Sequence, residues 1–448
     1  MNTHRRDSPF WSRVATVSVA LGFGVAACAP VAPAAQPGAA LSATAAPAAA
    51  APASRAGQDA IQIALPGYAF ALNPEFVRLA QVYSDEHPDQ PPIKLTLSAQ
   101  AQDLIDTSKF LLETKEQRSS FDAWFGITPF IDTVKLVEGG VLEPWDTYLP
   151  ADVKADIFPS NLQEGTYQGK LYSWPQITSV TGLNYRPSLL KAAGYDKPPA
   201  TWDEMLKVAG DVDAKTKPVR GLSFDTRVWR SLIPLAVSLG GDSAFGADGY
   251  LNWSDPSVSG ALDLMAKLAR NAPPDIFTAT GDVDVFKTSQ SAMLIKYVDA
   301  GITAAKAFGM NDYAFAPLPA AQAGGKSRTV QWGTGFALFK YARHKKEVAD
   351  FITYLVKNDA YQNGWINSGE PIVLQSWYTK LGDKTPAWLA ANSAMLQDTR
   401  FIPPTKDFLQ MATVTKPWVE KVLKGEATSQ EALQGSKADF EAALKRTS

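Results

Sequence analysis

The sequence predicts an α/β fold, and three apolar stretches separated by helical patterns carry this prediction. Residues 60–67, 93–97 and 121–126 each read as a buried strand. The helix between the first two strands is predicted to begin at Pro74, with Asn73 as its N-cap. Strands and helices that alternate at this spacing are typical of a mostly parallel sheet covered by helices.

Ligands of such sheets bind beyond the carboxyl ends of the strands. We expect these ends at residues 67–70, 98–102 and 126–129. Two further helices are predicted near them, at residues 101–113 and at 129–138, the second ended by a pair of glycines. The first α/β pattern therefore predicts a ligand-binding edge.

A second α/β pattern begins near residue 182. A strand there leads into a helix from Pro187, and Thr201 with Glu204 forms a predicted capping box at the start of the next helix. Ser254 or Asp255 is the expected N-cap of a later helix. The remaining predicted elements are strands at 220–225 and 291–299 and helices at 230–241 and 254–271. Two successive α/β patterns predict two domains.

The N-terminal residues are typical of a bacterial lipoprotein signal peptide. Three arginines precede an apolar run at residues 14–23, which is shorter than the roughly 20 residues that span a bilayer. The sequence Val25-Ala26-Ala27-Cys28 resembles a lipobox, whose cysteine is lipidated after cleavage. Cys28 is the chain's single cysteine, so it forms no intramolecular disulfide. The alternative is an ordinary signal peptide cut near Ala27.

The segment that follows is predicted to be a tether. Residues 29–57 are almost entirely Ala and Pro with a few Gly and Ser, and Arg55 is the only charged residue. Such a composition buries too little apolar surface to fold. We therefore divide the N-terminal part into a signal peptide, residues 1–27, and a lipidated cysteine with its tether, residues 28–58.

Composition and charge exclude several classes of function. The formal net charge of −2 argues against nucleic acid and against an anionic membrane surface as the main partner. Three histidines and one cysteine are too few for the usual zinc or copper sites, and we expect no metal and no cofactor. Roughly 390 residues after the tether favour two domains over one.

Seven segments together resemble a known family. In chain order they are GGVLEPWDTYLP, GTYQGKLYSWP, GLNYRPSLLKAAGYDKPPATWDEML, SDPSVSGALDLM, SAMLIKY, YAFAPLPA and GTGFALFKYARHKKEVADFITYLV. In this order they are similar to the extracellular solute-binding proteins of bacterial ABC importers, in the carbohydrate-binding group that includes maltose-binding protein. The resemblance runs from about residue 60 to the C-terminus. The acidic residues that grip glucose units in maltose-binding protein have no clear counterparts, so maltose is not implied.

The resemblance implies a periplasmic-binding-protein fold, in which two α/β lobes enclose a cleft and the chain crosses the hinge three times. Lobe one would hold residues 59–177 and 325–398, and lobe two residues 178–324 and 399–448. The crossings would lie near the sequences PQITSVTG, APLPAAQAGGKSR and DTRFIPP. Ligand would close the cleft by contacting both lobes.

A sugar presents apolar C–H faces and a rim of hydroxyls, so its site needs aromatic rings and fixed polar groups. Each candidate aromatic could equally be a core residue. The aromatic candidates are Tyr68, Phe70, Trp124, Trp174, Trp229, Tyr297 and Trp332. The polar candidates, at strand ends or in loops, are Gln102, Thr128, Asp225, Arg230 and Asp299. Charged groups suit the rim because their hydrogen bonds are strong and directional.

The sequence offers no catalytic set, and we expect no enzyme. Asp225 and Asp299 could be cast as a glycosidase pair, but nothing in the sequence fixes their separation. A nucleophile elbow, a phosphate loop and a His/Cys dyad are all absent. The alternative that keeps the fold is another ligand, such as a polyol, a glycerol phosphodiester or a peptide. A phosphate would need several convergent cations, and only Arg230 and Lys296 are candidates.

The sequence thus predicts a monomeric receptor held by a lipid on Cys28 at the membrane, in the periplasm or on the outer cell surface. It would capture a sugar of one to several units and deliver it to an ABC permease driven by an ATPase. No nucleic acid is expected as a partner.

Overall fold

The computed structural model describes residues 59–98, 107–277 and 281–447. The predicted signal peptide, Cys28 and the tether lie outside these residues. Among the described residues, ten strands join in one sheet, and β5 and β6 form a separate hairpin. The strands are β1 (Ile61–Pro66), β2 (Ile93–Ser98), β3 (Ala123–Ile127), β4 (Leu142–Glu143), β5 (Thr166–Tyr167), β6 (Lys170–Leu171), β7 (Trp174–Tyr185), β8 (Arg220–Phe224), β9 (Ser291–Tyr297), β10 (Ala314–Ala316), β11 (Thr329–Phe339) and β12 (Thr399–Phe401).

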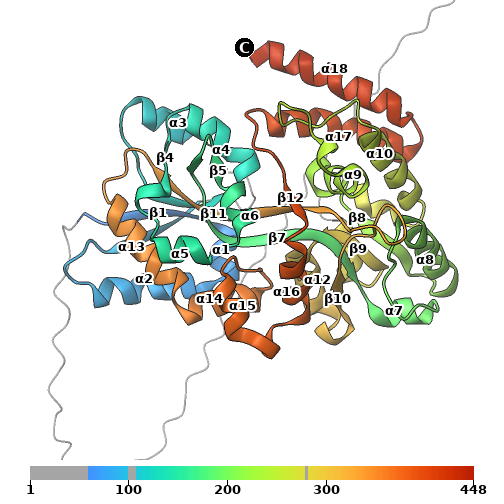
Figure 1. The fold of residues 1–448 in the computed structure, drawn as a ribbon, viewed down its shortest axis with the longest axis horizontal. Coiled ribbons are helices and arrows are strands. Elements are labelled where there is room, and N and C mark those ends of the chain that lie inside the picture. The colour runs from blue at the N-terminus through green and yellow to red at the C-terminus, as the bar shows by residue number, and fades with distance from the viewer. Residues whose placement is uncertain (1–58, 99–106, 278–280, 448) are drawn as a thin grey trace, which may run out of the picture. The chain divides into compact units, whose positions relative to one another are not determined.

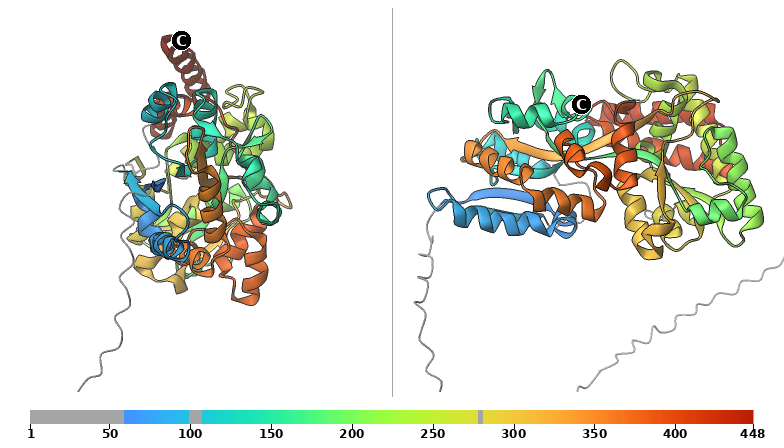
Figure 2. Two further views of the ribbon diagram at one scale, coloured as in Figure 1. Left: turned by 90° about the vertical axis from the view of Figure 1, so that its left-hand side faces the viewer. Right: turned by 60° about the horizontal axis from the view of Figure 1, so that its bottom comes forward.

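Two long strands, β7 and β11, connect the two halves of the sheet. The strand order is β2-β1-β3-β11-β7-β9-β8, with β4 and β12 paired to β11 and β10 paired to β7. The first part of β7 pairs with β11 as far as Val180, and from Thr181 onward β7 pairs with β9. Figures 1 and 2 show β7 and β11 running from the helices around β1 to the strands β8 and β9.

The sheet is mixed, so the prediction of a mostly parallel sheet was wrong. The pairs β1–β2, β1–β3, β8–β9 and β11–β12 are parallel. However, β11 runs antiparallel to both β3 and β7, and β7 runs antiparallel to β9. Local strand–helix order predicts parallel pairing within each half, but it carries no signal for β7 and β11, which lie more than 140 residues apart in the chain.

Helices surround this sheet. Up to Gly240 they are α1 (Gly67–Leu72), α2 (Pro74–Glu86), α3 (Ser108–Lys115), α4 (Pro129–Glu138), α5 (Ala151–Asp156), α6 (Pro159–Glu164), α7 (Pro187–Ala192), α8 (Trp202–Lys215) and α9 (Ile233–Gly240). The later ones are α10 (Pro256–Ala269), α11 (Gly281–Lys287), α12 (Val298–Phe308), α13 (Lys345–Val356), α14 (Asp359–Ser368), α15 (Gln375–Leu381), α16 (Ala387–Met395), α17 (Phe408–Lys424) and α18 (Ser429–Thr447). No helix of the described residues is long and apolar enough to cross a membrane.

Several helices begin where the sequence predicts, although their caps differ. The Thr201 side chain accepts a hydrogen bond from the Glu204 N–H, but the Glu204 carboxylate accepts from Ala200 N–H instead of completing a capping box. Asp255, not Ser254, is the N-cap of α10. Asn73 occupies the N-cap position of α2, but its amide donates to the Tyr361 carbonyl and makes no cap. The start of the helix predicted at 101–113 lies outside the described residues.

The buried apolar residues form two large cores, one on each side of the centre of the sheet. The first core gathers residues of β1, β3, β11 and the helices α2, α13 and α14, with Phe76, Phe125 and Phe336 in mutual ring contact. The second core gathers residues of β8 and β9 and the helices α8, α9, α10 and α17. Because β7 and β11 contribute to both cores, the strands that join them are themselves firmly packed.

Candidate functional site

A cavity lies where β7 and β11 pass between the two cores. Its volume of about 440 Å³ falls within the range of small-molecule sites. Three groups of residues line it. The β3 wall consists of Pro66, Tyr68, Trp124, Gly126, Thr128 and Ile131; the crossing strands contribute Ile177, Thr178, Ser179, Trp332, Gly333 and Thr334; the β9 wall consists of Arg227, Trp229, Arg230, Tyr297 and Asp299. Leu72 and Glu370 complete the lining.

The β3 wall is built at the carboxyl ends of β1 and β3, as predicted for an α/β sheet. Thr128 precedes α4, and its N–H donates to the Asp132 carboxyl over 2.9 Å. Burial raises the pKa of Asp132 to about 7, although this hydrogen bond and Lys135 oppose the shift. The β3 wall is thus supported by a carboxyl group that can hold its proton near neutral pH.

Two aromatic rings meet at the other side of the cavity. The rings of Tyr297 and Trp332 lie 4.7 Å apart between centroids and are inclined by 49°. Trp332 belongs to β11 and also stacks on Phe130 at 6.2 Å, whereas Tyr297 ends β9. Such rings offer a flat apolar surface, with further contact to the guanidinium of Arg230, which lies 5.2 Å from Tyr297 and 5.4 Å from Trp332.

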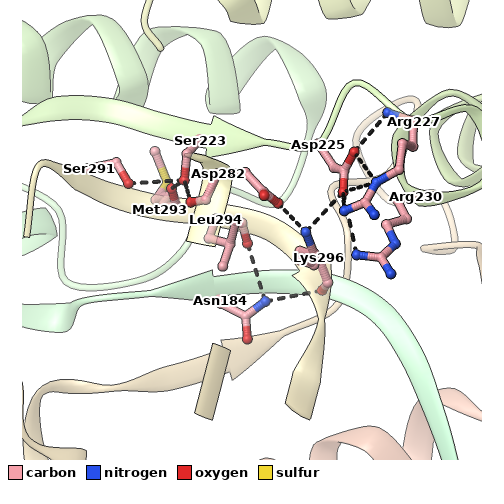
Figure 3. Close-up of polar contacts among 10 residues, drawn as sticks. All are labelled: Asn184, Ser223, Asp225, Arg227, Arg230, Asp282, Ser291, Met293, Leu294 and Lys296. Atoms are coloured by element: carbon pink, nitrogen blue, oxygen red, sulfur yellow. Dashed lines mark hydrogen bonds and ion pairs between the residues drawn. The ribbon is translucent and has the colours of Figure 1, made fainter. Parts of the chain in front are cut away.

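A charged cluster supports the β9 wall (Figure 3). It consists of Asp225, Arg227, Arg230, Asp282 and Lys296. Lys296 is only 1% exposed, and its ammonium lies 3.0 Å from a carboxylate oxygen of Asp225 and 2.5 Å from one of Asp282. Arg227 binds Asp225 with Nε at 2.9 and 2.8 Å and also with a terminal nitrogen, and Arg230 lies 3.6 Å from the same carboxylate.

The cluster fixes two arginines at the cavity. Burial alone would raise the pKa of Asp225, but Lys296 and the two arginines lower it well below its usual range. Asp225 therefore stays charged, and each of its cationic partners has a carboxylate within 4 Å. The hydrogen bonds of Arg227 and the ion pair of Arg230 thus hold both guanidinium groups close to Asp225.

Three hydrogen bonds, to the carboxyl groups of Asp299 and Glu164, hold the crossing strands. The Ser179 hydroxyl on β7 donates to Asp299 over 2.5 Å, which links the strand to the first turn of α12. On β11, the Gly333 N–H donates to the Glu164 carboxylate over 2.8 Å, and the Gln331 amide donates to the same group over 3.3 Å. Glu164 is buried, which raises its pKa to about 7.

The structure brings most of the predicted site residues together. The candidates that line the cavity are Tyr68, Trp124, Thr128, Trp229, Arg230, Tyr297, Asp299 and Trp332. Asp225 does not line it but holds Arg227 and Arg230, which do. That these residues contact a ligand stays a prediction.

Three candidates are not placed at the cavity. Trp174 is fully buried, packs edge-on against Trp145 at 5.3 Å and does not line the cavity, so we leave it out of the site. Phe70 falls within α1, and the position of its side chain is not described. Gln102 lies outside the described residues.

The residues at or behind the cavity that the sequence did not predict are Arg227, Ser179, Glu370 and the supporting carboxyl groups of Asp132 and Glu164. Only Arg227 carried a local signal, because it lies three residues before Arg230 and therefore one helical turn away. Among the described residues, no group of three or more His, Cys, Asp or Glu side chains could hold a metal ion.

Several known proteins are similar to this chain in sequence or in fold. An ABC transporter-binding protein of Deinococcus radiodurans is 31% identical over 224 residues, which cover 46% of this chain and about half (51%) of the relative. The tagatose-bound ABC transporter solute-binding protein of Thermotoga lettingae is 19% identical, with a TM-score of 0.73 over 86% of this chain and 99% of its own. The maltotriose-binding protein of Thermus thermophilus is 16% identical, with a TM-score of 0.68 over 86% and 100%.

These two structures share the fold of the chain, and the predicted α/β periplasmic-binding-protein fold is confirmed. The sequence pattern of one family, bacterial extracellular solute-binding protein, matches residues 74–362. This match covers most of the folded part and includes β3, β7, β9 and β11, which build the cavity. The chain therefore belongs to the family of bacterial extracellular solute-binding proteins.

Proposed function

We propose that the protein is the sugar receptor of an ABC importer, which binds a neutral mono- to oligosaccharide in the cavity between the β3 wall and the β9 wall. As a solute-binding protein the chain is not an enzyme, so its function is measured by binding. The observation that carries the proposal is the ring pair of Tyr297 and Trp332, which lies beside charges that are already paired.

The ring pair supplies what a saccharide needs on its apolar face. Pyranose C–H groups pack on aromatic rings, and contacts with the rings of Phe130 and Tyr297 hold Trp332 in place. Hydroxyls at the edge of the sugar would then find Arg230, Asp299 and Thr128 along the lining.

The charge cluster favours a neutral ligand over a phosphodiester. Arg230 and Lys296 are the cations that the sequence offers for phosphate. Lys296 is enclosed by Asp225 and Asp282, and Arg230 lies 3.6 Å from Asp225. A phosphate would have to compete with these carboxylates for both cations, at a cost in free energy. Solutes that carry such a group are therefore the weaker candidates.

The two hydrophobic cores support the proposed division into lobes at residues 59–177 with 325–398 and 178–324 with 399–448. Apart from a few residues, such as Phe130 and Phe315, each core draws on one of these sets. β7 and β12 contain residues of the first and third proposed crossings, and β11 begins directly after the second. A ligand that contacts both the β3 wall and the β9 wall would favour the closed arrangement.

Calorimetric titration of the purified protein with mono-, di- and oligosaccharides tests the ligand class. We expect one or two sugars to bind with a Kd on the order of 1 μM, about −8 kcal/mol, without any product being formed. Tryptophan fluorescence should change in parallel, because Trp124, Trp229 and Trp332 line the cavity. Binding of glycerol phosphodiesters or peptides, with no response to any sugar, would contradict the proposal.

The proposed anchor at Cys28 has a separate test. In a bacterial host that processes lipoproteins, the wild-type protein should fractionate with membranes and gain the mass of the lipid. The Cys28→Ala variant should lack that mass and leave the membrane fraction. Equal fractionation and mass of the two proteins would contradict the anchor and leave the sugar-binding proposal intact.

A further inference from the structure

The indole N–H of Trp124 is a buried donor at the edge of the cavity. Trp124 lines the cavity but is only 1% exposed, and within the described part of the chain its Nε1 atom has no hydrogen-bond partner. A tryptophan N–H can only donate. Buried donors are nearly always paired, so one left unpaired beside a cavity points to a partner that enters with the ligand.

Gly126 places this donor at the cavity. A Cβ atom on Gly126 would lie 3.0 Å from Trp124 Nε1, so the N–H edge of the ring borders the backbone of Gly126. Gly126 itself lines the cavity and has a positive φ of 127°, which favours glycine. The glycine thus leaves room beside the N–H group that any side chain would reduce.

The rest of the Trp124 ring packs against apolar side chains. It lies in an apolar cluster with Phe110, Ala64 and Phe339, and the Phe110 ring centroid is 5.9 Å away. The ring is anchored in this cluster. Its N–H edge borders Gly126, two residues further along β3, and therefore lies toward the carboxyl end of the strand. The donor is therefore preorganised before any ligand arrives.

We propose that Trp124 determines specificity by donating a hydrogen bond from Nε1 to one hydroxyl of the bound saccharide. This inference rests on the proposed function and adds a polar subsite at the β3 wall to the ring pair of Tyr297 and Trp332. A sugar that lacks an oxygen at the matching position leaves the buried N–H unpaired and is rejected.

The test is a pair of matched variants, Trp124→Phe and Trp174→Phe. Trp174 is also fully buried, and its Nε1 also has no partner among the described residues, but it does not line the cavity. Both changes keep an aromatic ring and remove one N–H group. Thermal unfolding of both variants shows how much each change costs the fold.

Calorimetry with the sugar that binds wild type gives the first result. We expect Trp124→Phe to raise Kd about tenfold and Trp174→Phe to leave it within about twofold of wild type. An equal Kd for Trp124→Phe and wild type overturns the inference. Equal weakening by both variants also overturns it, because the effect would then come from altered packing.

Monodeoxy derivatives of the same sugar give the second result. At one ring position, removal of the oxygen should weaken wild-type binding about tenfold but should not weaken the Trp124→Phe variant further. Additive losses at every position overturn the inference while sugar binding stands. If no sugar binds wild type, the proposed function fails, and this inference with it.

A third measurement needs no variant of Trp124. In wild type labelled with ¹⁵N in its indole groups, the parent sugar should shift one N–H signal that the matching deoxy sugar leaves in place. If both sugars shift the same indole signals equally, the inference is overturned. This test remains available even if Trp124→Phe fails to fold.

Discussion

Two buried carboxyl groups support opposite walls of the cavity, and their pKa values shift in opposite directions. Asp132 supports the β3 wall through Thr128, and burial raises its pKa to about 7. Asp225 supports the β9 wall through two arginines, and although burial opposes it, Lys296 with these arginines lowers its pKa. Both side chains are less than 10% exposed, so burial alone does not explain the difference.

The number of nearby cations decides the direction. Asp225 has three cationic partners within 4 Å, whereas Asp132 has a backbone N–H and only the weaker attraction of Lys135. On the β9 side, the carboxylates of Asp225, Asp282 and Asp299 balance the charge of the three cations. Asp132 does not line the cavity and can hold its proton near neutral pH. Little net charge therefore faces a ligand, which is consistent with a neutral sugar.

The largest expected effect comes from breaking the ion pairs of the β9 wall. Lys296→Met should lower the free energy of unfolding by about 3 to 5 kcal/mol, because it leaves Asp282 buried without its cation. Urea unfolding measures this loss. The control is Lys326→Met, which breaks an exposed pair with Asp398 and should cost less than about 1 kcal/mol. Equal losses in the two variants would mean that burial of the cluster is unimportant.

The β3 wall should respond to pH instead. Asp132 has its ordinary pKa of 3.8 when unfolded and about 7 when folded, so the folded state binds the proton more tightly. The Asp132 carboxyl therefore contributes about 2 to 4 kcal/mol to the free energy of unfolding below about pH 4. This contribution is lost as the pH rises through 7.

Asp132→Asn imitates the protonated form and should reduce the fall in unfolding free energy between pH 4 and 8. Glu164, whose pKa also rises to about 7, should maintain the remaining slope. Urea unfolding at several pH values measures both effects. If the variant and wild type lose stability in parallel over this range, Asp132 does not titrate as the structure indicates.

The ring pair joins the two walls, and its loss should affect binding more than folding. Trp332→Ala removes a ring that contacts Phe130 and Tyr297, and we expect the Kd for sugar to rise about 10- to 100-fold. Calorimetry measures the change. Trp418→Ala on α17 is the control, because Trp418 does not line the cavity and its N–H is bound to Asp439. A similar loss in both variants would place the effect outside the cavity.

The sequence predicted the local parts of this architecture better than the contacts between distant parts. The strands β1, β2, β3, β8 and β9 and most helix starts follow from apolar periodicity and from residues such as Pro74 and Thr201. Tyr297 and Trp332 were identified as cavity candidates because they lie at strand positions within family-like segments. Trp174, with the same kind of position, is a core residue, since its neighbour Trp145 comes from a distant turn.

The supporting groups had no such signal. Glu164 reaches Gly333 across 169 residues of sequence, and Lys296 reaches Asp225 across 71. Such contacts depend on the pairing of β7, β9 and β11, which local periodicity does not encode. A carboxyl group on a short helix looks exposed in the sequence, and only the tertiary structure shows that Glu164 is buried.

The smallest expected effect is the response of sugar binding to salt. Screening weakens interactions between a charged ligand and charged side chains, because the Debye length falls from about 10 Å at 0.1 M to about 3 Å at 1 M. A neutral sugar has no such interaction, and the ion pairs of Lys296 are buried from solvent. The Kd of the sugar should therefore change less than about twofold between 0.05 and 0.5 M NaCl. A ligand that meets Arg227 and Arg230 as an anion would instead bind more weakly as salt increases. Titrations at the two salt concentrations separate these cases, and a steep loss of affinity would mean that the β9 wall offers net positive charge to its solute.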